Sequence, residues 1–135
     1  METSPRSLPG AMTAAPAFGV TEPGSATSAS HWEAVVAEWR RVRAIWDPIA
    51  VAASTAEGAY WKDPSNTNKA EYERLSESSR EWMERDDTAL REVMATPAPS
   101  IQAVILKLEL GEEHCLSGAI GSAVADLRRL AVEDR

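Results

Sequence analysis

The chain has 135 residues, of which 44% are hydrophobic and 26% are charged, and its formal net charge is -7. This balance predicts one soluble domain with a tail. The excess of acidic residues argues against general binding to nucleic acid, which depends on Lys and Arg replacing the counterions around phosphates. No apolar run approaches the ~20 residues that would cross a bilayer, so we expect no membrane segment and a cytoplasmic location.

The first 29 residues are predicted to be a disordered tail. Pro, Gly, Ser, Thr and Ala fill 22 of the first 30 positions. Such a segment buries too little apolar surface to offset the entropy of ordering it. The helical domain is therefore expected to occupy residues 30–135.

The first predicted helix begins at Ser30, because Ser30 and Glu33 match the capping box. In this motif the Ser hydroxyl accepts a hydrogen bond from the backbone amide of the Glu, and the Glu carboxylate accepts one from the backbone amide of the Ser. Apolar residues then recur three and four apart, which places them on one stripe of a helix with coiled-coil-like spacing. This Trp stripe comprises Trp32, Val35, Trp39, Val42, Trp46, Ile49, Ala53, Ala56 and Tyr60.

Pro48 lies inside this first helix and lacks the amide that would bond to the Ala44 carbonyl. Two outcomes are open. The helix kinks near Trp46, or it restarts with Asp47 as its cap and Pro48 as its first residue. Because the stripe keeps its register through Pro48, we favour the kink.

A second helix is predicted after a loop at residues 61–67, with Asn68 as its cap and Glu71 completing the capping signal. Its other faces carry charged residues at i,i+4 spacing, which mark a solvated surface. Its expected inward face consists of Tyr72, Leu75, Ser79, Trp82, Met83, Ala89, Leu90, Val93 and Met94.

Two shorter helices are predicted after the prolines of residues 96–99. Ser100 is the expected cap of the third helix, and Gly111 suits its C-terminal end. The residues expected to face inward on the third helix are Ile101, Val104, Ile105 and Leu108. Those expected to share one face of the fourth are Leu116, Ile120, Val124, Leu127 and Leu130. The small residues expected to allow close helix contact are Gly118, Gly121, Ser122 and Ala125.

These elements together predict an all-α fold. We expect a long kinked helix paired antiparallel with the charged second helix, and two shorter C-terminal helices that close one end.

No catalytic, cofactor or metal site is predicted. Residues 112–115 include two Glu, His114 and Cys115, but consecutive helical side chains diverge by about 100° and do not converge on one ion. The same divergence separates His114 from Cys115 as a nucleophile and base, and no third residue is indicated. We therefore expect a protein that is not an enzyme, and we interpret Cys115, the only cysteine, as a small buried hydrophobic residue.

An alternative function is that of a small DNA-associated regulator. Residues 101–130 have the layout of a helix-turn-helix motif with Gly111 at the turn, but the second of those helices has no basic residue before Arg128. This charge pattern makes nucleic acid the weaker choice of partner.

The leading hypothesis is a non-enzymatic interaction or accessory protein. The Trp stripe either forms the core of a small bundle or stays partly exposed for a protein partner or a second copy. Residues 32–60 would span ~44 Å as a helix, far more than the ~15 Å of the third helix, which favours a homodimer unless residues 68–95 cover the stripe. The candidate interaction residues are Trp32, Val35, Trp39, Val42, Trp46 and Ile49.

Three short segments also resemble small uncharacterised helical proteins of alphaproteobacteria that are often found in prophage-like regions. The segments are residues 95–98 (ATPA), residues 104–108 with their Lys-Leu pair, and residues 126–131 (DLRRLA). The resemblance covers residues 31–131, whereas the tail and Pro48 depart from the usual pattern. It implies a helical fold in a bacterial cytoplasm and no particular activity.

Overall fold

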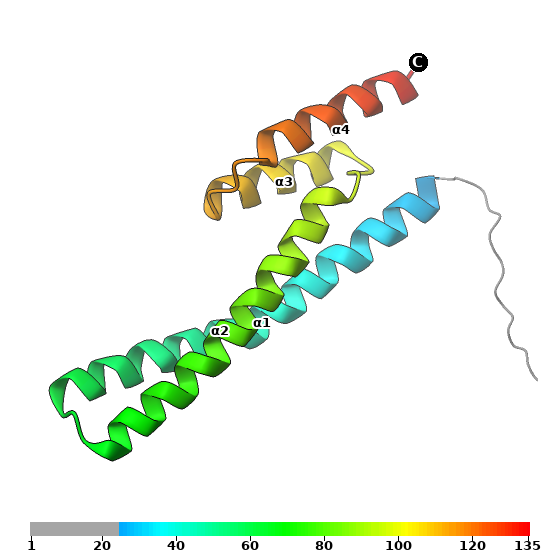
Figure 1. The fold of residues 1–135 in the computed structure, drawn as a ribbon. Coiled ribbons are helices and arrows are strands. Elements are labelled where there is room, and N and C mark those ends of the chain that lie inside the picture. The colour runs from blue at the N-terminus through cyan, green and yellow to red at the C-terminus, as the bar shows by residue number, and fades with distance from the viewer. Residues whose placement is uncertain (1–24) are drawn as a thin grey trace, which may run out of the picture.

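The computed structural model describes residues 25–135, with side-chain surroundings from residue 28 onward, and this part of the chain is helical with no strand. Its four helices are α1 (Ser25–Lys62), α2 (Asn66–Ala95), α3 (Ile101–Glu113) and α4 (Ala119–Glu133). α1 and α2 form a long antiparallel hairpin, and the α3/α4 pair lies at the end where α1 begins and α2 ends (Figure 1). The predicted all-α fold is confirmed.

Helix α1 begins at Ser25, so the predicted start at Ser30 is wrong. Pro23 and Gly24 are the last helix-breaking residues before it, and the following Ser and Ala residues tolerate helical geometry well enough to extend the helix by five residues. Residues 25–29 therefore belong to α1. The rest of the predicted disordered tail, residues 1–24, lies outside the described residues.

Helix α1 continues through Pro48 as one helix of 38 residues, so the alternative in which a new helix starts at Pro48 is wrong. Its ribbon changes direction near the middle (Figure 1). A bend is the expected effect of a proline inside a helix, since the ring displaces the preceding turn and removes one backbone hydrogen bond.

The turn between α1 and α2 is shorter than predicted, and the cap of α2 is Ser65 rather than Asn68. Ser65 Oγ accepts a hydrogen bond from the Asn68 amide at 3.1 Å. The Asn68 side chain instead donates to the Asp63 carbonyl at 2.8 Å and ties the turn together. Ser and Asn are both good capping residues, so the sequence pattern alone does not separate them.

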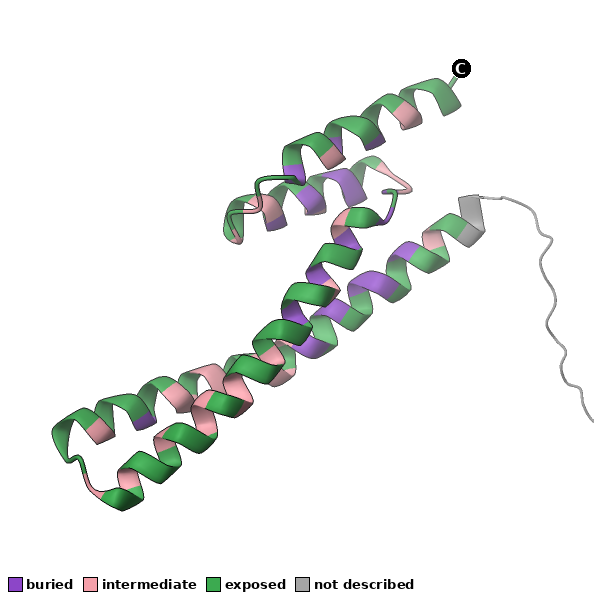
Figure 2. Ribbon diagram, in the orientation of Figure 1, coloured by how far each residue is buried: buried purple, intermediate pink, exposed green. Residues whose placement is uncertain are grey.

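The core is concentrated at one end of the hairpin, where the first half of α1 and the last turns of α2 meet α3 and α4. Figure 2 shows buried residues gathered there, whereas the half of the hairpin next to the α1–α2 turn is mostly exposed or half-buried. The buried cluster comprises Trp32, Val35, Val36, Trp39, Leu90, Val93, Ala98, Ala103, Val104, Leu110 and Ala123.

Helix α3 begins as predicted, with Ser100 Oγ accepting a hydrogen bond from the Ala103 amide at 3.2 Å. Its C-terminal end differs from the prediction because Gly111 lies inside the last turn and Cys115 takes the left-handed position, with φ 54°. The Leu116 amide bonds back to the Gly111 carbonyl at 2.9 Å, which closes a Schellman turn usually built with Gly in place of Cys115.

The close approach of α3 and α4 is made by Gly111 and Ala119. A Cβ placed on Gly111 would lie 2.3 Å from the Ala119 Cβ, whereas Gly118 and Gly121 have no neighbour within 4 Å of such an atom. The small residues expected to mediate close contact, Gly118 and Gly121, are therefore not the ones that do so.

Candidate interaction surface

The Trp stripe of α1 is largely covered by the rest of the chain. Trp32, Val35, Trp39 and Val42 are buried, and Trp46 and Ile49 are half-buried. α2 runs along this face of α1, as the core interpretation of the stripe requires. Trp46 and Ile49 are partly exposed, whereas the four buried residues could meet a partner only if the neighbouring helices moved away.

The expected inward face of α2 does line the hairpin, with one exception. Leu90 and Val93 are buried and the other expected residues are half-buried, but Met83 is exposed. The same face also buries the carboxylate of Asp86, which was not expected. Asp86 lies among other charged residues of α2, so nothing in the sequence pattern distinguishes it as the buried one.

Asp86 is 2% exposed and forms a two-pronged ion pair with Arg43 of α1. Arg43 Nε and Nη2 donate to the two carboxylate oxygens at 2.9 and 2.7 Å. The guanidinium carbon lies 4.9 Å from the centroid of the Trp46 ring, which adds a cation–π contact. This pair fixes how α1 and α2 are aligned.

Burial raises the pKa of the Asp86 carboxyl above its usual value. The charge and the hydrogen bonds of Arg43 oppose this rise, and so does the nearby His114, while Asp87 reinforces it. The cost of removing the carboxylate from water is thus larger here than the gain from its partners.

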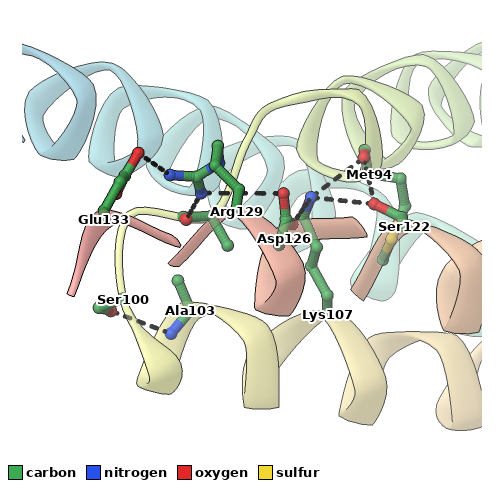
Figure 3. Close-up of polar contacts among 9 residues, drawn as sticks. Met94, Ser100, Ala103, Lys107, Ser122, Asp126, Arg129 and Glu133 are labelled. Carbon is green, nitrogen blue, oxygen red and sulfur yellow. Dashed lines mark hydrogen bonds and ion pairs between the residues drawn. The ribbon is translucent and has the colours of Figure 1, made fainter. Parts of the chain in front are cut away.

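A second buried ion pair joins α3 to α4. Lys107 is 1% exposed, and its Nζ donates to Asp126 Oδ2 at 2.6 Å, to Ser122 Oγ at 3.0 Å and to the Met94 carbonyl at 3.2 Å (Figure 3). The ammonium also lies 5.6 Å from the centroid of the Trp32 ring. Residues from the three other helices, α1, α2 and α4, therefore surround this one charge of α3.

The amine of Lys107 is fully engaged in hydrogen bonds that join α3 to α2 and α4. An ammonium has three N–H groups, and each of them has an acceptor here. Ser122 Oγ in turn donates to the Met94 carbonyl at 2.8 Å, so the acceptors are themselves held in place.

His114 is the C-cap of α3, and Cys115 directly follows it. The His114 ring packs edge-on against Trp39, with the ring centroids 6.1 Å apart. Cys115 is exposed at the Schellman turn, so its interpretation as a buried hydrophobic residue is wrong. Among the described residues, no group of three or more His, Cys, Asp or Glu side chains is placed to hold a metal ion.

The main departure from the sequence prediction concerns which faces of α3 and α4 are buried. Of the residues expected to face inward on α3, only Val104 is buried. Of those expected to share one face of the fourth helix, Leu116, which precedes α4, and Leu130 are half-buried. The inward faces use smaller or polar residues, such as Ala103, Ala123 and Lys107. Six aliphatic side chains between 38% and 70% exposed remain outside. They are Ile101, Ile105, Leu108, Ile120, Val124 and Leu127.

We call these six exposed side chains of α3 and α4 the aliphatic face. On each helix they occupy positions i, i+4 and i+7, which makes a single stripe. Ser122 contacts the Met94 carbonyl and Arg129 contacts the Ala98 carbonyl. The side of α4 that carries Ser122 and Arg129 therefore faces the end of α2 and the α2–α3 loop. Because α3 and α4 pair closely, helix periodicity leads us to expect both stripes on the side of the α3/α4 pair that faces away from the hairpin.

No helix in the described part of the chain has the length and apolar character needed to cross a membrane. Comparisons with protein-family models, with curated proteins and with solved structures found no match to this chain.

Proposed function

We propose that this chain is a non-enzymatic interaction protein that binds a protein surface through the aliphatic face of α3 and α4. The observation that supports the proposal is the gathering of six exposed branched side chains on two adjacent helices. Single exposed apolar residues are common on folded proteins, whereas exposed apolar residues grouped on neighbouring helices are a frequent feature of binding surfaces.

The proposal places the contact surface on α3 and α4 instead of on the Trp stripe. The stripe already serves as core, with Trp32, Trp39 and Val42 buried inside one chain. The aliphatic face has no such cover among the described residues. We further propose that the protein works in the cytoplasm, where a single exposed thiol such as Cys115 stays reduced.

The alternative of a DNA-associated regulator has less support from the same surface. In a helix-turn-helix protein the second helix would present polar and basic groups to the DNA. Here the outer side of α4 carries Ile120, Val124 and Leu127. Its Arg129 is engaged with Glu133 at 3.0 Å and with the Ala98 carbonyl.

The proposal is tested by photo-cross-linking in the native host, with a photoreactive amino acid placed at Ile105. Because Ile105 is at the centre of the aliphatic face, we expect a protein adduct that depends on irradiation. Val51 of α1 provides the control, since it is an aliphatic residue away from this face that is even more exposed than Ile105, 67% compared with 47%. The absence of any adduct from Ile105, Ile120 and Val124 would overturn the proposal.

A further inference from the structure

We infer that the occupant of the aliphatic face is a second copy of this chain, so that two α3/α4 pairs stack as layers in a two-fold symmetric dimer. This inference rests on the proposed function and names the partner. In such a dimer the same six residues come from both chains, and each apolar stripe meets another apolar stripe.

The shape of the face favours a layer of two helices as its partner. Ile101, Ile105 and Leu108 run beside Ile120, Val124 and Leu127 on helices of similar length, 13 and 15 residues. The best-formed surface hollows of the described residues are lined by other side chains. Rows of aliphatic side chains at helical spacing form ridges, and such ridges pack into the grooves of a facing helix layer.

A second α3/α4 pair supplies the complement that this surface needs. Two flat helical layers pack through interdigitating aliphatic side chains, as the two halves of a four-helix bundle do. If both copies buried their six side chains, the contact would remove on the order of 1,000 Å² from water, which reaches the lower limit of a specific interface.

Charge also directs two copies to this face. The chain has a net charge of -7, so two copies repel each other over most approaches. The two stripes contain no charged residue, and the acidic side chains next to the α3 stripe, Glu109 and Glu112, lie along its border, each four residues after a member of the stripe. Contact through the aliphatic face brings two copies together without placing like charges in the middle of the interface.

The test is the mass of the purified full chain in solution, measured by light scattering over a hundredfold concentration range. A reductant is present because Cys115 is exposed and could otherwise link two chains covalently. We expect the mass to approach twice 14.6 kDa as the concentration rises. A mass of 14.6 kDa throughout would overturn the dimer.

Two charge-matched variants locate the interface. Ile105→Glu should weaken dimerisation at least tenfold, because it buries a carboxylate in an apolar contact, whereas Val51→Glu should leave it unchanged. Circular dichroism confirms that both variants remain helical. If Val51→Glu breaks the dimer and Ile105→Glu does not, the face is wrongly assigned.

The cross-linking experiment separates a failure of this inference from a failure of the proposed function. An adduct at Ile105 with the mass of two chains supports both. An adduct with a different protein, together with a constant mass of 14.6 kDa in solution, overturns the dimer and keeps the interaction function. The absence of any adduct together with a constant mass overturns both.

Discussion

Lys107 shows how far one residue can depart from its sequence pattern. In an amphipathic helix a lysine is expected on the solvated side, yet this one is buried and bonded to Met94, Ser122 and Asp126. Its partners lie 13 to 19 residues away along the chain, beyond the reach of any local spacing rule. Long-range pairs of this kind leave no periodic signal in the sequence.

Removing the charge of Lys107 should be costly. In Lys107→Met the carboxylate of Asp126 stays buried without its main partner, and we expect a loss of about 3–5 kcal/mol in the free energy of unfolding. Urea denaturation followed by circular dichroism measures this loss. Adding Asp126→Leu should restore part of the stability, because the unpaired charge is then removed as well.

The control for Lys107 is an exposed ion pair. Arg74 pairs with Glu71 at 2.8 Å on the surface of α2, and Arg74→Met should leave the unfolding midpoint unchanged. If Lys107→Met is equally harmless, the buried network does not stabilise the joint between the hairpin and the α3/α4 pair.

Asp86 should make stability depend on pH in the opposite sense to a usual surface carboxylate. Its pKa is raised in the folded chain, chiefly by burial. The folded state therefore holds this proton more tightly than the unfolded state does. The stability that the proton supplies is complete below the unfolded-state pKa and is lost as the pH rises through the folded-state pKa.

The measurement is the free energy of unfolding of the native chain and of Asp86→Asn at several values between about pH 3 and pH 7. The advantage of the native chain over the variant should shrink as the pH rises. A difference that grows with pH would mean that Arg43 lowers the pKa of Asp86 more than burial raises it.

At the scale of the elements, sequence periodicity predicted the number, order and type of the helices and the cap at Ser100. It also identified the apolar stripes of α3 and α4, but of the four residues expected to face inward on α3 only Val104 does so, and Ile101, Ile105 and Leu108 are exposed. A local pattern shows which residues share a face, whereas the neighbouring helices decide which face is buried. Here Ala103, Ala123 and Gly111 allow the close packing, and the larger aliphatic residues remain outside.

The candidate surface was therefore predicted only in part. The Trp stripe has the strongest apolar signal in the sequence, and that strength reflects its place in the core. The aliphatic face consists of residues that were all expected to be apolar and helical. The Lys107–Asp126 pair and the Gly111–Ala119 contact set which sides of α3 and α4 face each other, and so leave this face exposed. No local spacing rule predicts either contact.

Two glycines should respond in opposite ways to the same substitution. Gly111→Ala places a methyl group 2.3 Å from the Ala119 Cβ, so α4 must shift, and we expect a loss of about 1–3 kcal/mol. Gly121→Ala meets open space on an exposed side of α4 and should raise stability by about 0.5–1 kcal/mol. Thermal unfolding of both variants is the measurement, and equal shifts would contradict the close contact.

At the scale of the whole molecule, burial divides the hairpin into two halves of different stability. The half near the α3/α4 pair contains Trp32, Trp39, Leu90 and Val93, whereas the half near the turn ends in Trp61, which is 72% exposed (Figure 2). Local opening requires less free energy where fewer apolar contacts are broken.

Hydrogen exchange measured by mass spectrometry should reveal this division. We expect the amides of residues 52–62 and 66–76 to exchange faster than those of residues 32–42 and 88–94, although both sets are helical. The comparison between two stretches of the same helix serves as the internal control. Uniform protection along α1 would show that the hairpin opens as one unit.

The Met94 carbonyl also bears on the order in which the protein can be completed during synthesis. It lies near the end of α2, and its partners Lys107 and Ser122 are made 13 and 28 residues later. A ribosome adds about 5–20 residues per second, so these partners follow the Met94 carbonyl within seconds, and until they dock the acceptor is unpaired and Trp32 is uncovered at the end of the hairpin. During that interval the apolar end of the hairpin is exposed, because the α3/α4 segment that covers it has not yet docked. A holding chaperone would bind this end most readily then.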